Sequence, residues 1–176
     1  NYKLGNYLKK NLTLTGMMGV GKTTIGKALS KHFSMEFIDI DKIIEKKLKL
    51  TIEEIFEQMG EVFFRKLEEE ITLQEIEKNN RVISLGGGAF MNKQIRDFVI
   101  SNTISFWLNL NTNLLAIRLK NSKKRPLLIN KDIKLTLEKI YNERRNTYSL
   151  ANHMIDCDNL NVDLVVKKII KIYENK

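Results

Sequence analysis

Residues 11–33 read NLTLTGMMGVGKTTIGKALSKHF, and three consecutive patterns in them set the expected architecture. Residues 11–15 alternate polar and apolar side chains, which is typical of a short strand. Residues 16–23, GMMGVGKT, fit the pattern G-x-x-x-x-G-K-[ST], and residues 23–33 carry apolar side chains at helical spacing. Because the motif lies directly between a strand and a helix, it predicts a phosphate-binding loop for a nucleoside triphosphate.

The glycines and the polar residues of this loop each have a physical role in holding phosphate. Gly16 and Gly21 let the backbone curl so that successive N–H groups face one phosphate, and Gly19 permits close approach. The helix that begins near Lys22 adds the positive end of its dipole. Lys22 supplies a compact cation for the β and γ phosphates, and Thr23 supplies a hydroxyl for Mg²⁺. The predicted nucleotide-binding residues of this loop are Gly16, Met17, Met18, Gly19, Val20, Gly21, Lys22, Thr23 and Thr24.

Strand and helix patterns alternate along the rest of the chain, which is typical of an α/β protein with a doubly wound parallel sheet. The predicted strands are residues 11–15, 37–40, 81–85, 103–108 and 153–157, and the predicted helices are residues 23–33, 41–48, 51–59, 61–78, 92–101, 112–119, 132–148 and 162–173. Thr51 and Glu54 form a capping-box pattern, and Gly60 marks the end of that helix. In such a sheet, ligands bind beyond the carboxyl ends of the strands.

Length and composition indicate one domain, residues 1–176, with a substantial core. The 176 residues are 43% hydrophobic and 29% charged, and no stretch approaches the roughly 18 apolar residues that a membrane helix needs. The single cysteine, Cys157, excludes an intrachain disulfide and a four-cysteine zinc site. Because no signal-peptide pattern is present, we expect a soluble cytoplasmic protein.

The net charge of +9 suggests an anionic partner, which is nucleic acid, a membrane surface or a small phosphorylated ligand. A nucleic-acid-binding module predicts aromatic side chains interleaved with a clustered basic face. Here the basic residues are dispersed, and Phe63, Phe64, Phe106 and Trp107 lie in apolar stripes. We therefore expect small-molecule substrates, with neither nucleic acid nor membrane as a partner.

Several features favour a small-molecule kinase among proteins with this loop. The chain lacks the [NT]KxD motif that gives GTPases their guanine specificity, and it is too short for a motor protein. A polar, basic loop at about residues 119–131 is suited to a lid, which excludes water so that the phosphoryl group goes to a substrate hydroxyl.

Two carboxylates, Asp39 and Asp41, end the second predicted strand. Residues two apart on a strand point the same way, so we expect both carboxylates to face the γ-phosphate end of the loop. One of them could hold Mg²⁺ through a water, and the other could accept a hydrogen bond from a substrate hydroxyl. Asp41 could instead simply cap the helix that follows it.

Six motifs in order and at matching spacing resemble the shikimate kinase family, from the phosphate loop to the last helix. They are GMMGVGKTTIGKAL at residues 16–29, FIDIDKIIE at 37–45, EIFEQMGEVFFRKLEEE at 54–70, ISLGGGAF at 83–90, RPLL at 125–128 and ERRNTY at 143–148. The resemblance implies a three-layer P-loop fold with a five-stranded parallel sheet of order 2-3-1-4-5, substrate-binding helices at about residues 41–78, and a monomer. It also implies an Mg²⁺-dependent transfer of the γ-phosphoryl group of ATP to the 3-hydroxyl group of shikimate, on the way to chorismate.

The resemblance also implies roles for individual residues on the acceptor side. Asp41 matches the aspartate that binds the 3-hydroxyl group, and Asp39 matches the outer-sphere partner of Mg²⁺. Arg65 matches a ligand of the substrate carboxylate, with Glu68 orienting it. Arg144 matches the second carboxylate ligand because it lies four residues before a tyrosine, although Arg145 remains a rival.

The glycine run and two further arginines complete the predicted site. Gly86, Gly87 and Gly88 follow a strand and leave the backbone bare, so their N–H groups can approach substrate and phosphate. By resemblance, Arg125 is the catalytic lid arginine that reaches the transferring phosphate. Arg118 would stack on adenine, and Asn159 lies in the segment that closes over the other face of the base.

The alternatives are another small-molecule kinase of this fold, such as a gluconate or nucleoside-monophosphate kinase, and a non-catalytic relative. The first would keep the phosphate loop but lack the combination of Asp41, Arg65, the three glycines and Arg144. Every residue that the resemblance assigns to the chemistry is present, which disfavours the second.

Overall fold

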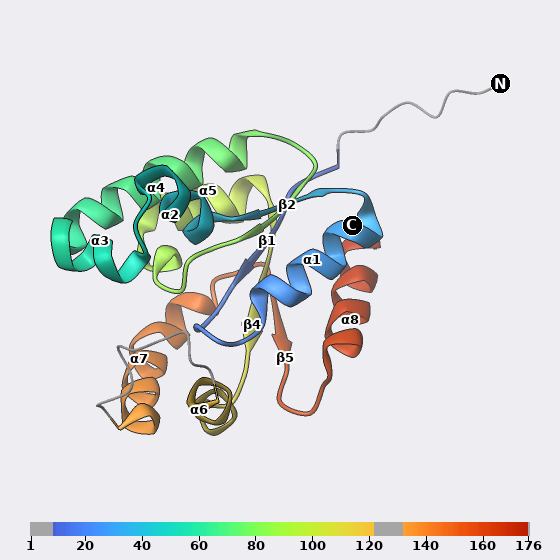
Figure 1. Ribbon diagram of the computed structural model, residues 1–176. Coiled ribbons are helices and arrows are strands. Elements are labelled where there is room, and N and C mark those ends of the chain that lie inside the picture. Colours follow the sequence, from blue (N-terminus) through green and yellow to red (C-terminus); the bar gives the residue numbers. More distant parts are fainter. Residues whose placement is uncertain (1–8, 122–131, 176) are drawn as a thin grey trace.

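The computed structural model describes residues 9–121 and 132–175, and the five strands in these ranges form one parallel sheet (Figure 1). The strand order is β2-β3-β1-β4-β5, as predicted. The strands are β1 (Leu12–Thr15), β2 (Glu36–Asp39), β3 (Arg81–Ser84), β4 (Ile104–Asn109) and β5 (His153–Asp156). The helices are α1 (Lys22–Phe33), α2 (Ile40–Leu48), α3 (Ile52–Met59), α4 (Glu61–Glu77), the short 3₁₀ helix η1 (Ala89–Met91), α5 (Lys93–Asn102), α6 (Thr112–Lys120), α7 (Ile133–Tyr148) and α8 (Val162–Glu174).

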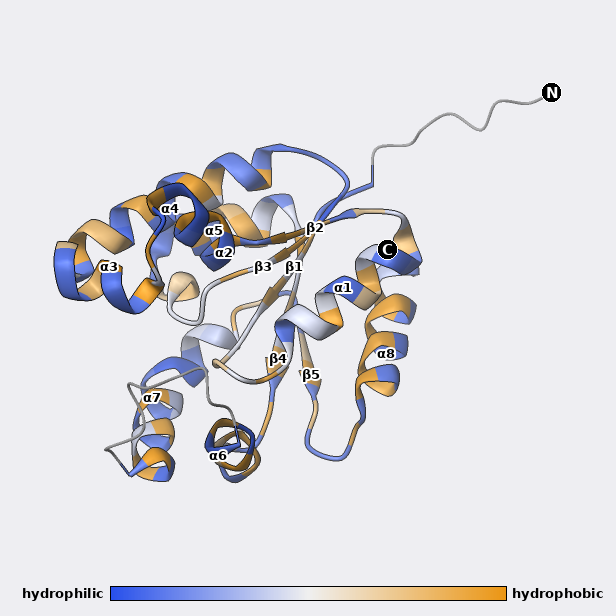
Figure 2. Ribbon diagram, in the orientation of Figure 1, coloured by the Kyte–Doolittle hydropathy of each residue, from blue (hydrophilic) through white to orange (hydrophobic). Residues whose placement is uncertain are grey.

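The central strand β1 is fully buried, because parallel sheets of this kind are covered on both faces. Leu12 lies opposite Val82 on one side and opposite Ile104 on the other. In Figure 1, α1 and α8 lie together on one side of the sheet, whereas α2, α3, α4 and α5 gather on the other. The apolar colouring in Figure 2 is strong on the strands, and the helices carry both kinds of residue. The phosphate loop therefore follows the central, fully buried strand of the sheet.

Local sequence explains how the helices near the site begin and end. Thr51 and Glu54 form the predicted capping box, in which each side-chain oxygen accepts from the other residue's backbone N–H, at 3.1 and 2.8 Å. Gly60 ends α3 with a φ of +84°, in the region that favours glycine. Helix α1 packs so closely on β2 that a β-carbon on Gly26 would lie 2.4 Å from the Phe37 ring. This contact sets the spacing between the phosphate loop and the end of β2.

The observed boundaries of these strands and α-helices differ from the predicted ones by at most one residue, and one such difference matters. Strand β2 ends at Asp39, and α2 begins at Ile40, so Asp41 lies in the first turn of a helix. The prediction that Asp41 lies on the same strand as Asp39 is therefore wrong. The cap of α2 is Asp39, whose carboxylate accepts from the Lys42 N–H at 3.3 Å, rather than Asp41.

One aromatic residue also departs from its predicted place. Phe63 is 37% exposed, and only its neighbour Phe64 enters the core from the start of α4. Among the described residues, no helix combines the length and the apolar character needed to cross a membrane.

Candidate active site

The phosphate loop joins the carboxyl end of β1 to the amino end of α1. Gly16, Gly19 and Gly21 have φ values of +145°, +80° and +106°, which side-chain-bearing residues rarely adopt. A β-carbon on Gly16 would also lie 2.7 Å from the Leu108 carbonyl oxygen. Both constraints explain why the motif requires glycine, and they leave the loop's backbone free to contact a ligand.

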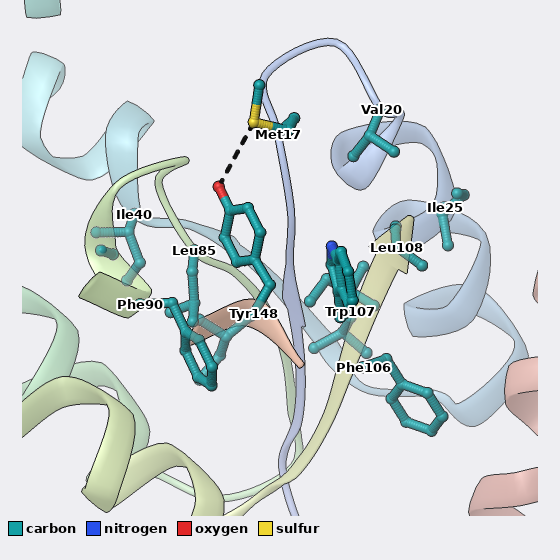
Figure 3. Packing of buried hydrophobic residues seen from close by; sticks show 14 of the residues in the cluster. Met17, Val20, Ile25, Ile40, Leu85, Phe90, Phe106, Trp107, Leu108 and Tyr148 are labelled. Atoms are coloured by element: carbon teal, nitrogen blue, oxygen red, sulfur yellow. Dashed lines mark hydrogen bonds between the residues drawn. The ribbon is translucent and has the colours of Figure 1, made fainter. Parts of the chain in front are cut away.

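The remaining side chains of the loop divide between the core and the ligand side. Met17 and Val20 are 3% and 2% exposed and point into the core, so these residues offer only backbone groups to a ligand (Figure 3). The Lys22 ammonium donates to the carbonyl oxygens of Gly16 and Met17, at 2.6 and 3.2 Å. It therefore lies across the loop, where a polyphosphate would bind. Met18 is half-buried and Thr24 is exposed in the first turn of α1.

Thr23 and Asp39 bring two oxygen ligands together at the foot of the loop. The Thr23 hydroxyl donates to the Asp39 carboxylate at 3.3 Å, across the gap between α1 and β2. Hydroxyl and carboxylate oxygens suit a hard divalent cation. No group of three or more His, Cys, Asp or Glu side chains in the described part of the chain could hold a metal ion alone. A cation at this pair would thus complete its shell with phosphate oxygens and water, as Mg²⁺ sites at nucleotides do.

The three glycines after β3 allow charged side chains to approach the backbone closely. A β-carbon on Gly86 would lie 2.8 Å from both Asp41 Oδ1 and Glu68 Oε2, and one on Gly88 would lie 2.6 Å from Arg65 Nη2. At Gly87 it would lie 3.5 Å from Arg144 Nη1 and 3.7 Å from the Met18 nitrogen. The loop of residues 86–88 is thus the point where three helices, α2, α4 and α7, and the phosphate loop meet.

Arg65 is held in place by charge and by aromatic rings. Its Nη1 donates to Glu68 Oε1 at 2.9 Å, and its Nε lies 3.7 Å from Glu61 Oε1. The guanidinium also lies 5.2 and 5.9 Å from the ring centres of Phe64 and Phe56. Glu68 is buried, and burial raises the pKa of its carboxyl while the neighbouring Arg65 opposes that rise. A guanidinium fixed in this way presents its remaining N–H groups in one direction.

The structure distinguishes between the two candidate arginines of α7. Arg144 is half-buried and lies beside Gly87, whereas Arg145 is exposed. Burial raises the pKa of the Tyr148 hydroxyl, and the nearby positive charge of Arg144 opposes that rise. Arg144 is therefore the arginine that the fold brings to the glycine loop.

The structure describes the residues predicted to bind adenine but not most of the predicted lid. Arg118 is exposed on α6, and its Nη1 donates to the carbonyl oxygens of Val20 and Gly19, at 3.0 and 3.4 Å. Asn159 is exposed in the turn after β5, and the charge of Arg118 reaches the neighbouring Cys157. Arg125 lies outside the described residues, as do residues 122–131 of the predicted lid.

Two residues of the site, Tyr148 and Phe56, were not among the site residues predicted from the sequence. Tyr148 is fully buried, and its hydroxyl donates to the Gly87 carbonyl oxygen at 2.5 Å. Phe56 lies under Arg65 and packs against Phe64, with ring centres 4.7 Å apart. Tyr148 entered the sequence interpretation only as a spacing marker, because only the tertiary fold brings the end of α7 to the loop after β3. Phe56 is one of four apolar residues in the eight-residue helix α3, so no local signal distinguished it.

Three features define this protein as a P-loop kinase for a small acceptor. They are the sheet order, the phosphate loop after β1, and the cluster of the Asp41 carboxylate and the Arg65 and Arg144 guanidinium groups around residues 86–88. A gluconokinase from Sinorhizobium meliloti shares the fold, with a TM-score of 0.60 and 14% identity over 96% of this chain and 95% of that one.

Closer similarity is found to one kinase family. The family described as shikimate kinase matches residues 18–174. A shikimate kinase from a Sulfurihydrogenibium species is 40% identical over 164 residues, which is 92% of this chain and 96% of that protein. The structure of a shikimate kinase from Acinetobacter baumannii in complex with shikimate has a TM-score of 0.87 and 33% identity, over 96% of this chain and 95% of that one. The chain belongs to the shikimate kinase family.

Proposed function

We propose that this chain transfers the γ-phosphoryl group of ATP to the 3-hydroxyl group of shikimate, giving shikimate 3-phosphate and ADP. The observation that carries the proposal is the meeting of Asp41, Arg65 and Arg144 around residues 86–88, directly beside the phosphate loop. Two guanidinium groups and one carboxylate are the complement of a small acceptor with a carboxylate at one end and a hydroxyl at the other.

The nucleotide binds along the phosphate loop and the start of α1. Backbone N–H groups of residues 16–24 and the dipole of α1 attract the phosphates. The Lys22 ammonium leaves the carbonyl oxygens of Gly16 and Met17 and binds the β- and γ-phosphate oxygens instead. Arg118 and Asn159 lie on either side of the adenine, and the hydrogen bonds from Arg118 to the carbonyl oxygens of the phosphate loop support its place at the nucleotide.

The metal ion is Mg²⁺, held by the Thr23 hydroxyl and by Asp39 through water. Their contact at 3.3 Å and the all-oxygen chemistry of the pair support this assignment. When bound, Mg²⁺ neutralises charge that develops on the phosphate oxygens.

The acceptor binds with its carboxylate between Arg65 and Arg144 and its 3-hydroxyl group at Asp41. Arg65, already fixed by Glu68 and by two aromatic rings, loses little freedom on binding. Asp41 orients the hydroxyl group and accepts its proton late in the transfer, since the loose transition state of phosphoryl transfer demands little of the nucleophile early. Arg125 stabilises the charge on the transferring group from the lid.

One chain is sufficient for the proposed activity. The phosphate loop, Asp41, Arg65 and Arg144 all come from a single copy, and their mutual contacts need no second one. We therefore propose that the enzyme acts as a monomer.

The test is ADP release from ATP and Mg²⁺, measured with shikimate, gluconate, AMP or no acceptor, with the product identified by mass spectrometry. We expect release only with shikimate, and a product heavier by one phosphoryl group. Equal turnover with gluconate or AMP, or with water alone, would leave the phosphate loop's role intact and rule out shikimate as the specific acceptor.

A further inference from the structure

The Tyr148 hydroxyl lies between the two loops that hold the two proposed substrates. It donates to the carbonyl oxygen of Gly87 at 2.5 Å and lies 4.0 Å from the sulfur of Met17 (Figure 3). Gly87 belongs to the acceptor side of the site, and Met17 belongs to the phosphate loop. A single buried oxygen atom therefore touches both sides.

The proposed carboxylate ligand Arg144, one helical turn earlier, also lies at this point, because its Nη1 would be 3.5 Å from a β-carbon on Gly87 and its charge acts on the Tyr148 hydroxyl. A guanidinium can only donate and a carbonyl oxygen can only accept, whereas a hydroxyl can do both. The Tyr148 proton is therefore donated to Gly87, and the lone pairs of the Tyr148 oxygen stay available to a donor such as Arg144.

The ring that carries this hydroxyl has little freedom to move. It is fully buried, and it stacks on Trp107 of β4 with ring centres 5.8 Å apart. Burial raises the pKa of Tyr148, so the phenol keeps its proton and remains a donor at neutral pH. The Tyr148 hydroxyl is thus held in a fixed position relative to the sheet.

We infer that Tyr148 is a positioning residue, which locks Arg144 and the glycine loop into one acceptor-binding unit and seats that unit against the phosphate loop. The inference rests on the proposed function, because it assigns the locked unit to the acceptor carboxylate. Because Tyr148 holds Gly87, the Arg144 guanidinium that lies beside Gly87 is kept in place for the acceptor carboxylate.

The first experiment compares Tyr148→Phe with Tyr173→Phe. Both changes remove one phenol hydroxyl that donates to a backbone carbonyl, but Tyr173 donates to Lys10, which precedes β1 at the opposite end of the sheet. We expect Tyr148→Phe to raise the KM for shikimate about tenfold, with the KM for ATP changed less than about twofold. Tyr173→Phe should leave both constants unchanged.

The second experiment repeats Tyr148→Phe in an Arg144→Ala background. If Tyr148 acts through Arg144, its effect on the shikimate KM should largely disappear there, since coupled residues are not additive. A full tenfold effect in that background would overturn the inference, as would a shikimate KM in Tyr148→Phe equal to that of the wild type. Equal rises in both KM values would also overturn it, because they would indicate general loosening of the fold.

Failure of the proposed function and failure of the positioning role can be told apart. A wild-type protein that phosphorylates no shikimate contradicts the proposed function, whereas an active wild type with a silent Tyr148→Phe contradicts only the positioning role. If Tyr148→Phe does not fold, Arg144→Lys carries the test, because lysine keeps the charge but lacks the rigid fork. We then expect a similar rise in the shikimate KM, and a wild-type value would overturn the inference.

Discussion

Asp41 is the carboxylate on which the proposed chemistry depends most directly. It lies beside Gly86 in the first turn of α2. We expect Asp41→Asn, which keeps the shape and removes the charge, to lower kcat by about 10²–10⁴ and to leave the KM for ATP almost unchanged. The measurement is the coupled ADP-release assay, with Asp97→Asn as the control because Asp97 is exposed and pairs with Lys93 on α5. A kcat for Asp41→Asn close to that of the control would contradict the assignment.

Arg65 is expected to act on binding rather than on the chemical step. Lysine would keep its charge but would lose the planar fork that contacts Glu68 and presents the remaining donors. Arg65→Lys should therefore raise the KM for shikimate about ten- to a hundredfold while kcat and the KM for ATP change little. Lys66→Ala, at the exposed neighbouring position, is the control for the assay. The prediction fails if kcat falls and the KM for shikimate does not rise.

At the scale of elements, the junction between α3 and α4 and the loop after β3 contain glycines with opposite requirements. Gly88 has φ −97° and ψ −5°, which alanine accepts, but its β-carbon would strike the Arg65 guanidinium. Gly60 has φ +84° and no atom within 4 Å of the position of its β-carbon. Gly88→Ala should therefore raise the KM for shikimate with little loss of stability. Gly60→Ala should lower the free energy of unfolding by about 1–3 kcal/mol, because φ +84° with ψ 165° is a conformation essentially restricted to glycine, and should leave the KM unchanged.

Urea unfolding and steady-state kinetics are measured for both Gly88→Ala and Gly60→Ala, so that each variant serves as the control for the other. A Gly88→Ala variant that is unstable but kinetically normal would mean that the loop is a structural turn. The same result for both variants would mean that backbone conformation alone matters at both positions.

The sequence predicted the elements well, because strand alternation, the phosphate loop and the capping box are all local signals. It failed at Asp41, because β2 passes into α2 without an intervening loop and Asp39 serves as the helix cap. It also could not assign Phe63 and Phe64 to opposite environments, or separate Arg144 from Arg145, since adjacent residues differ only in the side of the helix they occupy. The contacts of Tyr148 with Gly87 and Met17 span 61 and 131 residues, so no local pattern could predict them.

At the scale of the whole molecule, Cys157 links stability to pH. The thiol is buried beyond β5, and burial raises its pKa from an ordinary 9.0 to about 11. Between these values the unfolded chain loses the thiol proton while the folded chain keeps it, so the free energy of unfolding falls as pH rises. Cys157→Ala lacks this contribution.

Urea unfolding of wild type and Cys157→Ala at pH 8 and pH 10.5 measures the effect. We expect the stability of the wild type relative to the variant to fall by about 1–2 kcal/mol between the two pH values. A constant difference would show that the thiol is accessible to solvent in the folded protein.

The pairing of β1 has a consequence for how the protein is made. The strand that carries the phosphate loop pairs with β3 and β4, and Thr15 lies opposite Trp107, about ninety residues later. At a synthesis rate of about 5–20 residues per second, roughly 5–20 s pass on the ribosome between these two residues. The nucleotide-binding loop is thus translated well before the two strands that support it, β3 and β4. We expect a nascent chain to acquire affinity for ATP only after β4 has left the ribosome.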